Sequence, residues 1–141
     1  MKVFVFGSNT SGWHGKGAAL EAIHSWGAIY GVGSGFMNKG TEDPERGCYA
    51  LPTKDSHLRT LPLVTIQESV KEFLFFAKTY PHWDFLVTRV GCGLAGYHDT
   101  DIAPFFEGAS DNCQFDPAWV KFGLKTWLTL EDLIETNPQR L

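Results

Sequence analysis

Two glycine-rich stretches and one basic stretch hold the residues that could do chemistry. Residues 7–17 and 91–97 each follow an apolar run and precede a helix start, so each is predicted to be a loop between a strand and a helix. Glycine lets another group approach the backbone closely, and free backbone N–H groups gather where a helix begins. The two stretches therefore predict anion-binding loops, and tight turns without a ligand are the alternative.

Each loop supplies its own candidate ligand-binding residues. In the first loop these are Ser8, Asn9, His14, Gly15, Lys16 and Gly17. In the second loop they are Gly91, Cys92, Gly93, Leu94, Ala95, Gly96 and Tyr97. Ser8 and Asn9 could hydrogen-bond to hydroxyl groups, and His14 could donate to a phosphate, with a purely structural histidine as the alternative. Cys92 could be a nucleophile or a small buried filler.

The basic stretch begins at Lys54, directly after a predicted strand at 48–51, and continues with His57 and Arg59. A lysine beside an apolar wall can lose its proton and act as a nucleophile, and it can also contact a phosphate. A solvated surface charge is the alternative. His98 and Asp99 follow the second loop at a helix start, where either could serve in acid–base catalysis.

Composition limits the class of protein. A chain of 141 residues with 43% hydrophobic residues predicts one globular domain, 1–141. The net charge of −4 argues against a nonspecific grip on a nucleic-acid backbone, but not against a nucleotide held by N–H groups. The three cysteines include no CxxC pair, so we expect no metal, no other cofactor and no disulfide framework. Without a signal peptide or a membrane span, a cytoplasmic location is expected.

Strand and helix patterns alternate along the chain. Strands are expected at 3–6, 28–32, 48–51 and 85–87, with an edge strand at 112–115, and residues 33–47 are expected to be a mobile loop. Helices are expected from 15 to 27 and from 65 to 80, the second opened by a capping box of Thr65 and Glu68, with a last helix start at Thr129 and Asp132. Residues 119–127 stay undecided. This order predicts an α/β fold with a largely parallel or mixed sheet.

Neither glycine loop is a known nucleotide fingerprint. Residues 15–17 lack the spacing of a P-loop, and residues 31–35 lead into a loop where a dinucleotide fingerprint would lead into a helix. Two glycine loops at the ends of two strands still predict one ligand across both, because ligands of open α/β sheets lie at the carboxyl ends of strands. The loops could hold two phosphates of a diphosphate, or a phosphate and a ribose.

Three motifs together resemble the macrodomain family. They are residues 9–19, NTSGWHGKGAA, residues 52–54, PTK, and residues 89–96, RVGCGLAG. The nearest branch contains DNA ADP-ribosyl hydrolase antitoxins and terminal ADP-ribose glycohydrolases, and short phage-related proteins are also similar. The resemblance covers about residues 3–108 and implies a three-layer α/β/α sandwich with a mixed, largely parallel sheet. Residues 109–141 are an unplaced C-terminal extension, and the family's usual leading strands are missing.

The resemblance implies roles for particular residues. Asn9 matches the asparagine that contacts the distal ribose, and residues 91–97 match the loop around the diphosphate. Lys54 matches the lysine that attacks the anomeric carbon of ADP-ribose linked to a base or a carboxylate. The glycohydrolases carry an acidic residue where this chain has Ala95, which leaves His98 or Asp99 as the candidate acid–base group.

The expected function is therefore binding of ADP-ribose, or of a nucleotide derived from it, and hydrolysis of an ADP-ribosyl bond with Lys54 as nucleophile. Its partner would be ADP-ribose or an ADP-ribosylated macromolecule such as DNA. One alternative is a module that binds ADP-ribose or a cyclic nucleotide signal without cleaving it, and another is a phosphatase that acts on phosphorylated ADP-ribose. The oligomeric state stays open.

Overall fold

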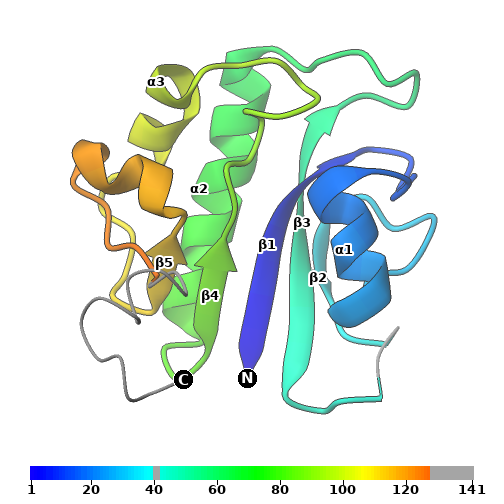
Figure 1. The fold of residues 1–141 in the computed structure, drawn as a ribbon, viewed down its shortest axis with the longest axis horizontal. Coiled ribbons are helices and arrows are strands. Elements are labelled where there is room, and N and C mark those ends of the chain that lie inside the picture. Colours follow the sequence, from blue (N-terminus) through cyan, green and yellow to red (C-terminus); the bar gives the residue numbers. More distant parts are fainter. Residues whose placement is uncertain (40–41, 128–141) are drawn as a thin grey trace, which may run out of the picture.

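The computed structural model describes residues 1–39 and 42–127, and a single sheet runs through its middle (Figure 1). The strands are β1 (Lys2–Asn9), β2 (Gly35–Met37), β3 (Arg46–Lys54), β4 (Asp84–Val87) and β5 (Cys113–Phe115). They lie in the order β2-β3-β1-β4-β5, and every neighbouring pair is parallel except β2 with β3. The predicted mixed, largely parallel sheet is confirmed.

Helices cover both faces of this sheet, which gives three layers (Figure 1). The helices are α1 (Gly17–Ser25), α2 (Leu63–Thr79) and α3 (Asp99–Ile102), and the 3-10 turns are η1 (Ala103–Phe106) and η2 (Pro117–Phe122). Alternate residues of a strand point to opposite faces, so Val5 of β1 joins the core under α2, whereas Phe6 joins the core under α1. The predicted α/β/α sandwich is confirmed.

Helix α2 follows its sequence pattern, but its start differs from the prediction. One side buries residues at helical spacing: Ile66, Val70, Phe73 and Ala77. The helix begins two residues before Thr65, with Pro62 as an extended N-cap whose carbonyl accepts from the N–H groups of Thr65 and Ile66. The predicted capping box of Thr65 and Glu68 was therefore wrong, because Pro62, with its φ already fixed near the helical value, starts the turn earlier.

Residues 28–32 were predicted to be a strand and instead form a turn. Gly27 and Gly31 adopt φ angles of 84° and 90°, which bend the chain too sharply for a strand. The Gly31 N–H donates to the carbonyl of Gly12 at 3.0 Å, so this turn packs against the first glycine loop. A Cβ at Gly12 would lie 2.4 Å from the Val32 nitrogen, and only glycine fits this close approach.

Residues 33–47 were predicted to be a mobile loop, but they contain β2 and the start of β3. The predicted edge strand at 112–115 is confirmed as β5, which lies at one edge of the sheet. Within the undecided stretch 119–127, η2 extends to Phe122. The helix start predicted at Thr129 and Asp132 lies outside the described residues. In the described ranges, no helix has both the length and the apolar character needed to cross a membrane.

Candidate functional site

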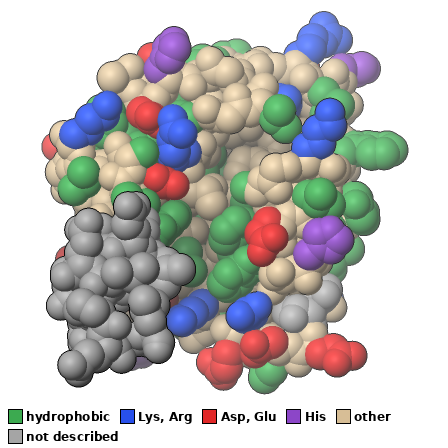
Figure 2. Space-filling model, viewed as in Figure 1, with side chains coloured by type: hydrophobic (Ala, Val, Ile, Leu, Met, Phe, Trp, Pro, Cys, Tyr) green, Lys and Arg blue, Asp and Glu red, His purple; other side chains and the backbone are tan. Residues whose placement is uncertain are grey.

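A cavity of about 600 Å³ opens at the carboxyl ends of β1, β3 and β4. Its walls come from residues 7–9, 13 and 15–19, from residues 53, 54 and 58, and from residues 88–95. Figure 2 shows the surface hollowed between α1 and the β4 side of the sheet. The two glycine loops and Lys54, which lie far apart in the sequence, therefore border one space, because β1 pairs with both β3 and β4 in parallel.

The side chain of Asn9 shapes the first loop. Its Oδ1 accepts from the N–H of Trp13 and from the hydroxyl of Ser11, both at 2.9 Å, and its Nδ2 donates to the Trp13 carbonyl at 2.8 Å. The hydroxyl of Ser8 donates to the buried carbonyl of Gly33. Both residues line the cavity, but the polar groups that were expected to meet ligand hydroxyls already hold the loop.

His14 does not line the cavity. Its ring is fully buried against Phe6, and Nε2 donates to the carbonyl of Val32 at 2.8 Å. Nδ1 has no hydrogen-bond partner in the described part of the chain. The structural alternative for this histidine is thus the one observed, since its ring fixes the 28–32 turn to the first loop.

The start of α1 presents free N–H groups to the cavity. The first backbone hydrogen bond at this end runs from Leu20 to the Lys16 carbonyl at 3.3 Å, and Lys16, the N-cap, supplies no side-chain cap. The N–H groups of Gly17, Ala18 and Ala19 consequently have no acceptor among the described residues, and all three residues line the cavity. The partial positive charge of a helix start favours an anion at this wall.

The second loop faces the cavity with a comparable set of donors. Its internal hydrogen bonds run from Cys92 to Arg89 at 3.0 Å, from Gly96 to Gly93 at 3.0 Å, and from Tyr97 to Gly91 at 2.9 Å. In the described ranges, no acceptor is bonded to the N–H groups of Gly91, Gly93, Leu94 and Ala95, and all four residues line the cavity. Such a run of unpaired N–H groups is a suitable cradle for a phosphate.

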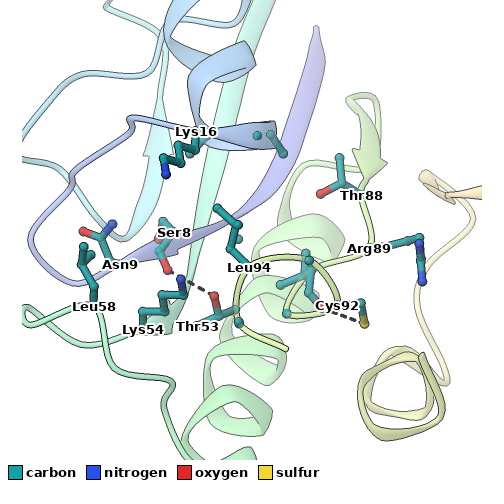
Figure 3. A pocket seen from close by; sticks show the side chains of 18 of the residues that line it. Ser8, Asn9, Lys16, Thr53, Lys54, Leu58, Thr88, Arg89, Cys92 and Leu94 are labelled. Atoms are coloured by element: carbon teal, nitrogen blue, oxygen red, sulfur yellow. Dashed lines mark hydrogen bonds between the residues drawn. The ribbon is translucent and has the colours of Figure 1, made fainter. Parts of the chain in front are cut away.

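Lys54 ends β3 and reaches the cavity between these two loops (Figure 3). The residue is half-buried, and its Nζ makes no hydrogen bond or ion pair with any residue in 1–39 or 42–127. Trp13, Leu58 and Leu94, here called the apolar rim, also line the cavity, with 70%, 55% and 68% of their surface exposed. Leu58 adopts a φ of 61°, an unusual conformation for leucine, which places it in the cavity wall.

His98 and Asp99, the predicted acid–base candidates, stay outside the cavity, as do Gly96 and Tyr97. His98 is exposed, and the Tyr97 hydroxyl donates to the Leu61 carbonyl at 2.6 Å. Asp99 accepts from Arg89 and from the Trp119 indole, and these bonds lower the pKa of its carboxyl to about 2. An acid so strongly ionised has no proton to donate at neutral pH.

The charged side chains that line the cavity are all basic among the described residues. Lys16, Lys54 and Arg89 line it, whereas no aspartate or glutamate does so among the described residues. The thiol of Cys92 also lines it, and burial, reinforced by the Asp99 carboxylate, raises its pKa to about 12, so it is a poor nucleophile. In the part of the chain that the structure describes, no cluster of three or more metal-ligating side chains is present.

Some residues that line the cavity were not predicted from the sequence to belong to the site. Trp13, Leu58 and Thr88 line the cavity. Trp13 lay in the first glycine loop and Thr88 in the strand end that leads into the second, and these positions were the available signal. Leu58 gave no signal, since its place in the wall depends on its backbone conformation.

The sequence matches no protein-family model and no curated protein. Solved structures do match. The macrodomain of DarG from Mycobacterium tuberculosis is 17% identical with a TM-score of 0.63, covering 80% of this chain and 86% of that chain. The macrodomain of DarG from Thermus aquaticus is 16% identical with a TM-score of 0.60, covering 80% and 85%.

A third similar structure is DarTG from Thermosipho africanus, solved in complex with ADP-ribose. It is 14% identical with a TM-score of 0.57, and the match covers 80% of this chain and 37% of that chain. These similarities show that this chain has the macrodomain fold.

Proposed function

We propose that this protein binds ADP-ribose in the cavity and hydrolyses an ADP-ribosyl bond with Lys54 as the nucleophile. One observation carries the proposal: two sets of backbone N–H groups without an acceptor among the described residues, at residues 17–19 and at residues 91 and 93–95, border one cavity with the free amine of Lys54 between them. N–H groups of this kind bind phosphate oxygens regardless of the net charge of −4. The similarity to DarTG, which was solved with ADP-ribose, supports this choice of diphosphate ligand.

The cavity suits the parts of such a ligand. Its volume of about 600 Å³ lies within the range of pockets that enclose a small organic ligand. The diphosphate would lie on the second loop and the start of α1, and one ribose would then be close to Lys54. Trp13 of the apolar rim offers a flat face for a ring at the cavity mouth.

The proposed reaction has two steps. The neutral amine of Lys54 attacks the anomeric carbon of the ADP-ribosyl group, the bond to the leaving group breaks, and the leaving group departs with the bonding electron pair and a proton that originates from the amine. The sugar–lysine adduct opens to an imine. Water then adds to the imine carbon, ADP-ribose leaves, and Lys54 is regenerated.

A non-catalytic module for ADP-ribose or a cyclic nucleotide signal is the second candidate. The observation that favours it is the lack of any aspartate or glutamate among the described lining residues, since a carboxylate would ordinarily activate the water or protonate the leaving group. If the protein is a hydrolase, the Lys54 amine itself must supply the proton that the leaving group takes.

Calorimetry with ADP-ribose, followed by turnover assays on ADP-ribosylated DNA and on ADP-ribosylated carboxylate peptides, tests the two candidates together. The hydrolase proposal predicts binding and release of ADP-ribose from at least one substrate. Binding with no release from any of them would support the module, and no binding at millimolar ADP-ribose would contradict both. Lys54→Ala should lose this release but keep most of its affinity for ADP-ribose. Lys39→Ala is the matched control, because Lys39 lies outside the cavity lining.

A further inference from the structure

The Arg89 guanidinium and the Asp99 carboxylate form a two-pronged ion pair on the outer side of the second loop. Nε donates to Oδ1 and Nη2 donates to Oδ2, both at 2.9 Å. The Asp99 side chain is largely buried and that of Arg89 is about half exposed. This parallel geometry holds both side chains in one orientation more firmly than a single contact would.

A buried tryptophan also donates to this carboxylate. Trp119 of η2 is fully buried, and its indole Nε1 donates to Asp99 Oδ1 at 2.7 Å. Its ring packs against Phe106 and Phe115, with centroids 5.5 Å and 6.0 Å away. Asp99 is thus fixed to the core by a side chain that comes from the C-terminal extension.

The second loop connects this network to the cavity, because Arg89, where the loop begins, is itself a lining residue. Figure 3 shows the Arg89 side chain directed away from Leu94. Behind the loop, a Cβ at Gly91 would lie 3.3 Å from Ile102 Cδ1, so α3 packs closely on the loop backbone. Gly91, Gly93, Leu94 and Ala95, whose N–H groups have no acceptor among the described residues, all line the cavity.

We propose that Asp99 is a positioning residue: braced by Trp119, it holds Arg89 and thereby sets the orientation of the N–H groups of residues 91–95 toward the ligand. The proposal rests on the proposed function for its ligand, but the brace itself exists in the free protein. It also gives a role to the C-terminal extension as far as η2, because that segment supplies the buried end of the brace.

The brace is tested with Asp99→Asn, Arg89→Gln and the double variant, with Asp101→Asn as the control. Asp101 lies on the same helix α3, accepts from the His98 N–H at 3.1 Å, and makes no contact with Arg89. Exchange of the hydrogen-bonded amides of Cys92, Gly96 and Tyr97 is measured without ligand, and affinity for ADP-ribose is measured by calorimetry. Arg89→Lys tests whether charge alone restores the brace, which the two-pronged geometry argues against.

We expect Asp99→Asn, Arg89→Gln and the double variant to accelerate exchange of the Cys92, Gly96 and Tyr97 amides equally. Each should weaken ADP-ribose binding by about tenfold, by analogy with the loss of an outer-shell partner at a metal site. Asp101→Asn should change neither quantity. Trp119→Phe should reproduce part of the effect, and Asp99→Asn should shift the indole N–H resonance that Trp119→Phe removes.

Wild-type exchange of the Cys92, Gly96 and Tyr97 amides in Asp99→Asn would overturn the proposal. Effects of Asp99→Asn and Arg89→Gln that simply add in the double variant would also overturn it, because members of one brace cannot act independently. If wild-type protein does not bind ADP-ribose, the proposed function fails, and the exchange data on the free protein still decide whether the brace exists.

Discussion

Asn9 and Lys54 are register partners at the carboxyl ends of the adjacent parallel strands β1 and β3. A register irregularity falls between Ser8 and Asn9, and the N–H of Thr10 donates to the Lys54 carbonyl at 3.0 Å. The first glycine loop therefore leaves the sheet directly beside the proposed nucleophile. The sheet therefore fixes the relation between the first loop and the amine.

ADP-ribose is expected to stabilise the fold. A ligand that binds only the native state adds about 2.7 kcal/mol to the free energy of unfolding at a hundredfold excess over its Kd. Thermal melts with increasing ADP-ribose should show a midpoint that climbs steadily with concentration. AMP and ribose 5-phosphate serve as controls, because each offers one phosphate to two sets of N–H groups. A midpoint that stays constant up to millimolar ADP-ribose would contradict the ligand assignment.

Gly93→Val is expected to abolish ADP-ribose binding while the free energy of unfolding changes by no more than about 0.5 kcal/mol. The φ angle of Gly93 is not positive, and a Cβ there would meet nothing within 4 Å, so the fold tolerates a side chain. The valine would instead occupy the space in front of the loop's N–H groups. Calorimetry and urea unfolding measure the two quantities, and unchanged affinity would move the phosphate site elsewhere.

Gly91→Ala is the opposite case and should mainly reduce stability. Gly91 has a φ of 77°, and its added Cβ would lie 3.3 Å from Ile102 Cδ1. The left-handed conformation costs a residue with a Cβ roughly 1–2 kcal/mol. Urea unfolding should show a loss of that order. A variant as stable as wild type would mean that the loop can adopt another conformation at this position.

The Asp99 carboxylate makes stability depend on pH. Its pKa falls from 3.8 to about 2, chiefly because Arg89 donates to it, with a further contribution from the Trp119 indole. A carboxyl with a lowered folded-state pKa stabilises the fold above its unfolded pKa, and this contribution disappears as pH falls from about 4 to about 2. The free energy of unfolding of Asp99→Asn should therefore fall less between pH 5 and pH 2.5 than that of wild type. Equal falls in the two proteins would contradict this role for Asp99.

The sequence predicted the sheet and its loops well where patterns are local. The buried run before Gly91 and the helical spacing from Ile66 to Ala77 each appear as elements close to the expected bounds. The 28–32 turn was missed because an apolar run of that length has the same composition as a strand. Only the φ angles of Gly27 and Gly31, and the contact of Gly31 with Gly12, distinguish the two.

For the site, too, the sequence indicated the positions of residues better than the directions of their side chains. The positions of the glycine loops and Lys54 around one cavity follow from strand order, which alternating strands and helices imply. The directions of side chains do not follow from it. His14 lies in the core and Asp99 faces Arg89 because of partners at Val32 and Trp119, and sequence spacing gave no hint of either partner.

Borohydride trapping during turnover tests the role of Lys54 most directly. Reduction of the proposed imine would leave a stable ADP-ribosyl adduct, which peptide mass analysis assigns to one residue. We expect an adduct on Lys54 in wild-type protein. Lys54→Ala should lose turnover but keep most of its affinity for ADP-ribose, because backbone N–H groups hold the phosphates. Wild-type turnover with no adduct on Lys54, together with an active Lys54→Ala variant, would contradict this role of Lys54.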